Sequence, residues 1–319
     1  MPSESRRGRT ALIVTVAAVP FCFAGWLAWG AVDDDGEPAG RTRSAATPSG
    51  AGDATRSPRE AGREGADPDS GRGDPSGSVS PRQSTNDARE ADAGRPLAGK
   101  VVVLDPGHNV HNVDHPAEIN RLVDIGTNRK ECDTTGTATN RGYSEAEFTM
   151  DVARRVGALL DQRGAKVTYT HLGQRAWGPC VDERARIGNE AHADAAVSIH
   201  ADGSTSPTAR GFHVIVPAAV DAGGADTGAI TGPSRRLGLE LKEHYADATS
   251  LPPATYLGGG SGMTVRQDLG GLNLSKVPKV FIECGNMRNS ADADLLASAA
   301  GRQRVARGIA DGISGYLVG

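Results

Sequence analysis

The chain has no excess of basic residues. Its 319 residues include 35 lysines and arginines against 39 aspartates and glutamates, so the formal net charge is −4. A protein that binds nucleic acid normally presents a basic patch, and this balance argues against a nucleic-acid partner.

Large apolar side chains are almost absent from residues 33–97. This stretch consists mainly of glycine, proline, serine, aspartate and arginine, and no repeat or binding motif is visible in it. Such a segment buries too little apolar surface to offset the entropy lost on ordering. We expect a disordered tether of mixed charge that lets a domain reach away from an attachment point.

Only one long apolar run is present, from Ala11 to Val32. Its length of roughly 20 residues suits a bilayer-spanning helix and exceeds the apolar core of a usual signal peptide. Arginines precede the run and aspartates follow it, which favours an orientation with the N-terminus inside. Residues 1–32 are therefore predicted to be a membrane anchor. A small-residue site at Ala28-Trp29-Gly30 leaves cleavage and secretion as the alternative, and both options place the rest of the chain outside the cytoplasm.

Cysteines are few: four in the chain, of which Cys22 lies in the apolar run. Disulfides persist in oxidising compartments, and both Cys132 and Cys180 lie in polar, loop-like sequence. We expect these two to form a disulfide. Cys284 is then left as a buried thiol, the usual role of a structural cysteine.

Residues 98–319 carry the patterns of a folded domain, because apolar strand-like runs alternate with amphipathic segments. The patterns predict strands at 100–105, 165–171, 194–201, 211–217 and 277–284, and helices at 144–164, 181–193, 231–249 and 302–317. The helix at 144–164 shows a capping box, with Ser144 as N-cap and Glu147 three residues on. This alternation predicts a single α/β domain with a twisted, largely parallel sheet flanked by helices.

Four residues able to bind a metal or transfer a proton stand at the ends of these elements. His108 follows the first strand, His200 and Glu283 close later strands, and Glu145 opens the first helix. In open α/β sheets, functional sites lie beyond the carboxyl ends of the strands. We therefore expect these four side chains to meet at one edge of the sheet.

Two imidazoles and one carboxylate form a common catalytic zinc set that leaves one position open for water. We assign His108, Glu145 and His200 to Zn²⁺ and Glu283 to proton transfer. Asp105 is expected to set the angle of His108 or to accept a hydrogen bond from an imidazole.

Each assignment has a plainer alternative. Glu145 suits the N-terminal end of a helix without any metal, and Glu283 suits an ion pair at a strand end. Glu147 is a rival ligand, although the capping box accounts for it.

We interpret His111 and His115 as solvated or substrate-facing loop residues. The other histidines, His171, His192, His213 and His244, show no convergent partners and are interpreted as structural or surface groups. The glycine-rich segment 258–262 lacks the lysine of a phosphate-binding loop and is interpreted as a flexible loop beside the site.

Four blocks of the sequence resemble a known family. They are "VVVLDPGHN", "EAEFTMDVARRV", "SIHADG" and "VFIECGNMRN", and in this order they are similar to the zinc-dependent N-acetylmuramoyl-L-alanine amidases of type 3. The resemblance implies that His108, Glu145 and His200 bind zinc and that Glu283 is the catalytic acid and base. It favours Glu145 over Glu147 because the family's ligand stands three residues before the first apolar position, here Phe148. Arg184 and Asn289 also match recurrent family positions, for structural reasons.

The implied reaction is hydrolysis of the amide between the lactyl group of N-acetylmuramic acid and L-alanine in peptidoglycan. The chain departs from the family pattern in its longer segment 109–143, which contains Cys132 and is expected to form a disulfide-pinned loop beside the site. Two other functions stay open at this point: a zinc peptidase acting on the peptide stem, and a non-catalytic wall-binding module. Zinc peptidases commonly carry two ligands a few residues apart on one element, whereas the ligands here are dispersed.

Overall fold

The computed structural model describes residues 94–319. The predicted anchor, residues 1–32, lies outside the described residues, as does the predicted tether up to residue 93. Within the described part, no helix is both long and apolar enough to cross a bilayer. Leu97, at the end of the predicted tether, is fully buried in the domain core.

The domain is built on a six-stranded sheet with the order β4-β1-β5-β10-β6-β9. The strands are β1 (Val101–Pro106), β4 (Lys166–Tyr169), β5 (Ala195–Asp202), β6 (His213–Pro217), β9 (Met263–Arg266) and β10 (Lys279–Asn286). Strands β4, β1, β5 and β10 are mutually parallel, while β6 pairs antiparallel with β10 and parallel with β9. The predicted single α/β domain with a largely parallel sheet is confirmed, with β9 as an additional edge strand.

Five longer helices accompany the sheet among residues 94–319. They are α3 (Glu145–Gln162), α4 (Val181–Glu190), α5 (Gly228–Thr249), α7 (Ser290–Ala297) and α8 (Ala299–Val318). The predicted capping box of α3 is present, since the Ser144 hydroxyl accepts from the Glu147 amide and the Glu147 carboxylate accepts from the Ser144 amide. Asn289 is the N-cap of α7, where its side-chain oxygen accepts from the amides of Ala291 and Asp292, and this is its structural role.

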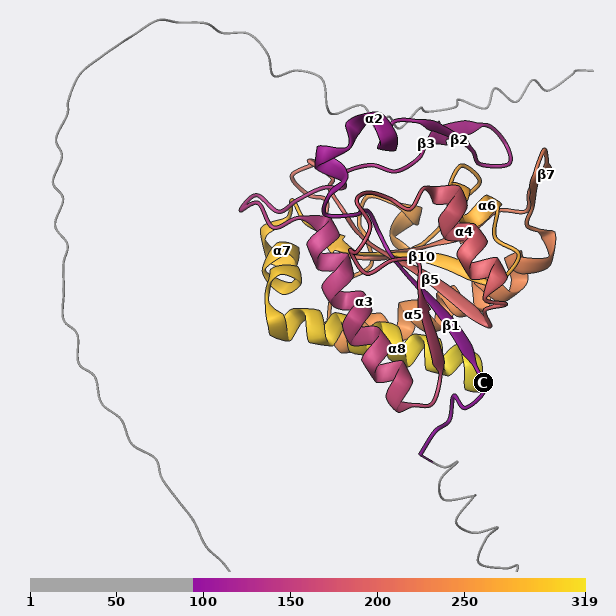
Figure 1. Cartoon of the computed structure of the whole chain (residues 1–319). Coiled ribbons are helices and arrows are strands. Elements are labelled where there is room, and N and C mark those ends of the chain that lie inside the picture. Colours follow the sequence, from indigo (N-terminus) through magenta and orange to yellow (C-terminus); the bar gives the residue numbers. More distant parts are fainter. Residues whose placement is uncertain (1–93) are drawn as a thin grey trace, which may run out of the picture. The chain divides into compact units, whose positions relative to one another are not determined.

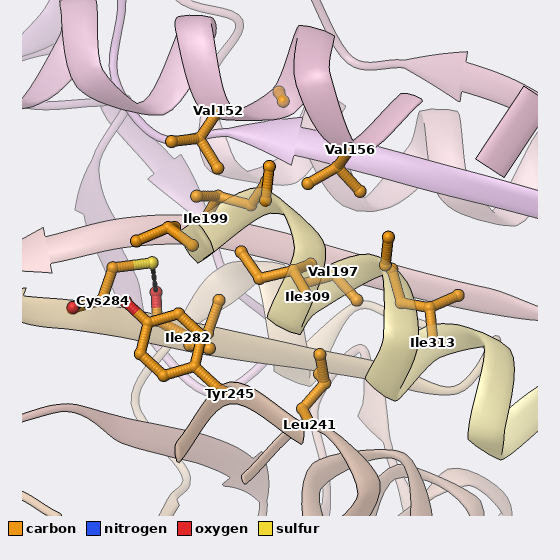
Figure 2. Close-up of a cluster of buried hydrophobic side chains, with 14 of the residues drawn as sticks. Val152, Val156, Val197, Ile199, Leu241, Tyr245, Ile282, Cys284, Ile309 and Ile313 are labelled. Atoms are coloured by element: carbon orange, nitrogen blue, oxygen red, sulfur yellow. Dashed lines mark hydrogen bonds between the residues drawn. The ribbon is translucent and has the colours of Figure 1, made fainter. Parts of the chain in front are cut away.

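Helices α3, α5 and α8 cover one face of the sheet (Figure 1). Every second strand residue points to this face and is apolar, as strand alternation requires. Figure 2 shows how Val152 and Val156 of α3 and Ile309 of α8 approach the strand residues Val197 and Ile282. This face holds the main core of the domain.

The opposite face of the sheet carries polar side chains. Asp105, Ser198 and Lys279 are all buried on it, and His200 and Glu283 stand further along β5 and β10. The helices α4 and the short α6 (Gly270–Asn273) lie over this face (Figure 1). One face of the sheet thus holds the main apolar core, and the other carries buried polar groups and the candidate site residues.

The long segment 109–143 contains small elements: a 3₁₀ turn η1 (Asn112–Asp114), α2 (Pro116–Ile119), and a hairpin of β2 (Leu122–Asp124) with β3 (Arg129–Glu131). The predicted disulfide between Cys132 and Cys180 joins the end of this hairpin to the start of α4.

Cys284 is a buried free thiol, as expected. A second small hairpin, β7 (Asp221–Ala222) with β8 (Ala225–Asp226), lies between β6 and α5, and the turn η2 (Gly258–Gly260) precedes β9.

Candidate functional site

His108, Glu145 and His200 meet at the carboxyl edge of the sheet. One possible ligand atom from each residue lies within 4.8 Å of the other two, and among residues 94–319 this is the only such cluster of metal-binding side chains. His108 Nε2 lies 3.2 Å from Glu145 Oε2, and His200 Nδ1 lies 3.0 Å from Glu145 Oε1. The predicted convergence of these three residues is therefore observed.

The backbone around this cluster is shaped to fit it. His108 itself adopts the left-handed conformation, with φ of 61°. Only glycine fits at position 107, because a Cβ there would collide with the imidazole of His200. Gly136, from the long segment, also lies close, and its Cβ would be 2.7 Å from His108 Cδ2 and 2.8 Å from Glu145 Oε2. The Pro-Gly turn after β1 thus lets two imidazoles pack at one point.

Backbone groups fix the carboxylate of Glu145. Its Oε2 accepts from the Thr137 amide at 2.9 Å, and its Oε1 accepts from the Ala201 amide at 3.1 Å. The carboxylate is buried and lies at the N-terminus of α3, where the helix dipole favours negative charge. Glu147 instead completes the capping box and is exposed.

Glu283 is placed beside the cluster by strand pairing. It is the partner of His200 in the β5–β10 register and of His213 in the β10–β6 register. Burial raises the pKa of its carboxyl well above the usual range, and the carboxylates of Asp202 and Glu145 raise it further. A carboxyl group with a raised pKa can both accept and donate a proton near neutral pH.

Asp133 is the side chain that orients His108, and sequence reasoning missed it. Its Oδ1 lies 3.4 Å from His108 Nδ1, and the backbone carbonyl of Thr134 lies 3.1 Å from the same nitrogen. These contacts engage Nδ1 and turn Nε2 toward Glu145. In the sequence, the indication of this role is that Asp133 directly follows Cys132, which the disulfide holds near the start of α4.

The expectation that Asp105 orients an imidazole is wrong. Its two carboxylate oxygens bind Thr170, Arg184, Ser198 and Lys279 instead. Burial alone would raise the pKa of Asp105, but the charges of Lys279 and Arg184 hold it well below its usual range. Asp105 is therefore the anionic centre of a buried ion network beneath the site. A lysine inside the apolar strand sequence "VPKVFIEC" was the signal for this network.

Arg184 joins this network to the site. Its guanidinium donates to Asp105 Oδ1 at 2.9 Å, to Asp133 Oδ2 at 2.8 Å, and to the backbone carbonyls of Pro106, His108 and Pro179. One buried side chain thus holds both the turn that carries His108 and the carboxylate that orients it. This confirms a structural role for Arg184.

Replacing Arg184 by methionine is expected to lower the free energy of unfolding by about 3–5 kcal/mol, because it leaves Asp133 buried without its cation. Arg186→Met is the matched control: it lies on the same helix, is exposed, and pairs with Glu183 and Glu190. The free energy of unfolding of this control is expected to fall by less than about 1 kcal/mol. Urea unfolding measures both, and equal losses would contradict the role assigned to Arg184.

The remaining histidines are distributed as follows. His111 is exposed, and His115 lies 3.4 Å from Glu118 at the surface, so neither belongs to the cluster. His171 is buried and contacts the carbonyl of Pro106 at 3.0 Å. His213 differs from expectation, because it has a convergent partner: it is buried and neighbours Glu283.

Comparison with known proteins identifies the family of this chain. Residues 102–315 match the family described as N-acetylmuramoyl-L-alanine amidase. An N-acetylmuramoyl-L-alanine amidase of Mycobacterium tuberculosis is 39% identical over 226 residues, which covers 69% of this chain and 88% of that protein. The crystal structure of the N-acetylmuramyl-L-alanine amidase Ami1 from Mycobacterium smegmatis is 43% identical, with a TM-score of 0.64 over 69% of this chain and 98% of the other.

The apo form of Ami1 from Mycobacterium abscessus gives similar values, with 40% identity, a TM-score of 0.63, and coverage of 69% of this chain and 100% of that one. The family match runs from residue 102 to residue 315 and includes His108, Glu145, His200 and Glu283. This chain belongs to the N-acetylmuramoyl-L-alanine amidase family.

Proposed function

We propose that this chain is a zinc hydrolase that cleaves the amide bond between the lactyl group of N-acetylmuramic acid and L-alanine in peptidoglycan. The observation that carries the proposal is the cluster of His108, Glu145 and His200, with donor atoms within 4.8 Å of one another, in a chain of the amidase family. Two imidazoles and a carboxylate fit the requirements of a catalytic zinc ion.

His108, Glu145 and His200 would hold the metal. A zinc ion so bound polarises a carbonyl group and lowers the pKa of water. Asp133 and Thr134 keep His108 in the required orientation by engaging its Nδ1. Thr137 and Ala201 do the same for Glu145 by donating to its two oxygens. The ligands are thus held in place before substrate arrives.

Glu283 supplies the proton transfer. Its carboxylate accepts the proton of the attacking water, and the resulting carboxylic acid passes that proton to the nitrogen of L-alanine as the amide bond breaks. The raised pKa of Glu283 suits both halves of this exchange. Two products result: a glycan with a free lactyl carboxylate, and a peptide with a free amino terminus.

The domain is proposed to act outside the cytoplasm, where peptidoglycan lies. The disulfide between Cys132 and Cys180 supports an oxidising compartment. Attachment to the membrane through residues 1–32, with residues 33–97 as a tether, stays a prediction from sequence, as does cleavage and secretion.

Mass analysis of digested peptidoglycan tests the function. Purified protein loaded with zinc is expected to release peptides that begin at L-alanine and to leave the glycan strands intact. Cleavage within the peptides would identify a stem peptidase instead. Retention on peptidoglycan without any release would identify a binding module.

A further inference from the structure

The face of the sheet that carries Glu283 continues toward the edge strand β9, with the apolar Ile215 between its polar side chains. Glu283 pairs with His213 of β6, and β6 pairs with β9 through Ile215 with Thr264 and Pro217 with Arg266. Side chains alternate along a strand, so His213, Thr264 and Arg266 point to the same face as Glu283. We call these four residues the polar row.

Two atoms of the polar row are buried without a hydrogen-bond partner in the described part of the chain: Nδ1 of His213 and Oγ1 of Thr264. His213 is only 3% exposed. Buried polar atoms nearly always have a partner, so each exception needs a reason. Burial and the nearby charge of Arg266 together lower the pKa of His213 to about 4 against the opposing effect of the Asp202 carboxylate, so the ring is neutral and its two nitrogens offer one donor and one acceptor. The middle of the row thus holds unpaired polar atoms between Glu283 and Arg266.

A cation stands at the far end of the row. Arg266 donates through Nε and Nη2 to the two oxygens of Asp268, each at 2.6 Å. Asp268 is shared with Lys130 of the β2–β3 hairpin at 3.1 Å, so two cations surround one carboxylate. Arg266 Nη1 makes no hydrogen bond within residues 94–319, and the side chain is 31% exposed. This end of the row can accept a further anion.

The length of the row matches a short extended peptide. Two strand spacings of about 4.8 Å and four residues of about 3.3 Å place the Cα atoms of Glu283 and Arg266 about 16 Å apart, and both side chains shorten the gap. An extended peptide covers about 3.3–3.6 Å per residue, so about three or four residues reach from the cut bond to the guanidinium.

We propose that the polar row is the subsite for the leaving peptide, with Arg266 binding a free carboxylate about three or four residues beyond the cut amide. His213 and Thr264 bond the peptide backbone between the two ends. The proposal rests on the proposed function, since it concerns the peptide released by that reaction. It makes Arg266 a residue that determines specificity without touching the reacting atoms.

The test compares soluble muramyl peptides of two to five residues, each as the C-terminal acid and as the C-terminal amide. For wild-type protein, kcat/KM is expected to favour the acid by about tenfold at a length of three or four residues, the scale of one charge-assisted hydrogen bond. Arg266→Gln is expected to bring the ratio of acid to amide close to one, while Arg266→Lys keeps part of the preference.

Arg235→Gln is the matched control, because Arg235 is exposed on α5, on the other side of the sheet. It should leave the ratio unchanged. A ratio that stays the same in Arg266→Gln, or a wild-type enzyme that cleaves acid and amide equally at every length, overturns the proposal while leaving the amidase activity established. If the wild type cleaves no muramyl peptide at all, the proposed function fails instead. Because the ratio is measured within each variant, a partial loss of folded protein does not alter it.

Discussion

Removal of divalent metal with a chelator is expected to lower the rate of muramyl-peptide cleavage by about 10³-fold or more, and added Zn²⁺ is expected to restore it. The expected size follows from the several kcal/mol that a bound zinc ion contributes to the stability of the transition state. Elemental analysis of the purified domain should find about one zinc per chain, because four-coordinate catalytic sites use three protein ligands.

Variants of single histidines locate the metal. His200→Ala is expected to lose both zinc and activity, since it removes one of three donor groups that lie within 4.8 Å of one another. His244→Ala is a matched control, because His244 is half-exposed on α5 and faces Glu240. Full metal content in His200→Ala, or full activity in the chelated protein, would contradict the assignment of the metal site.

Much of the fold follows from local patterns that can be recognised in the sequence. The capping box at Ser144 and Glu147 starts α3 at Glu145, and the turn after β1 brings His108 to the carboxyl edge of the sheet. Because the parallel strands end at one edge, the positions of His108, Glu145 and His200 in the sequence were enough to predict that they meet. That they bind zinc, and that Glu283 is the proton carrier, stays a prediction.

Other features depend on contacts between distant segments and have no local pattern. Strand β9 follows a glycine-rich turn and was not predicted, and it is held at the edge of the sheet by its pairing with the distant strand β6. The reversed direction of β6 changes which side chains neighbour Glu283, and this is why His213 was given no partner. The role of Asp133 arises only because the disulfide and Arg184 bring the long segment against His108.

Replacing Glu283 by glutamine is expected to lower kcat by about 10²–10⁴-fold while the zinc content stays at the wild-type level. The glutamine amide has nearly the shape of the carboxyl group, but it cannot accept the proton of water. Glu283 lies beside the metal cluster in the strand register and is not one of its three donors, so metal binding should survive the change. Steady-state cleavage of a muramyl peptide at saturating substrate, with zinc measured on the same sample, gives both quantities.

Glu147→Gln is the matched control, because it makes the same chemical change two residues from a proposed ligand. Glutamine can still accept the hydrogen bond from the Ser144 amide that completes the capping box, so stability should fall by less than about 1 kcal/mol. The rate and the zinc content should both stay near the wild-type values. If Glu147→Gln lost the metal, the ligand assigned on α3 would be wrong. If Glu283→Gln cleaved as fast as the wild type, the proton would have to travel by another group, and Asp202, whose carboxylate raises the pKa of Glu283, would be the next residue to replace.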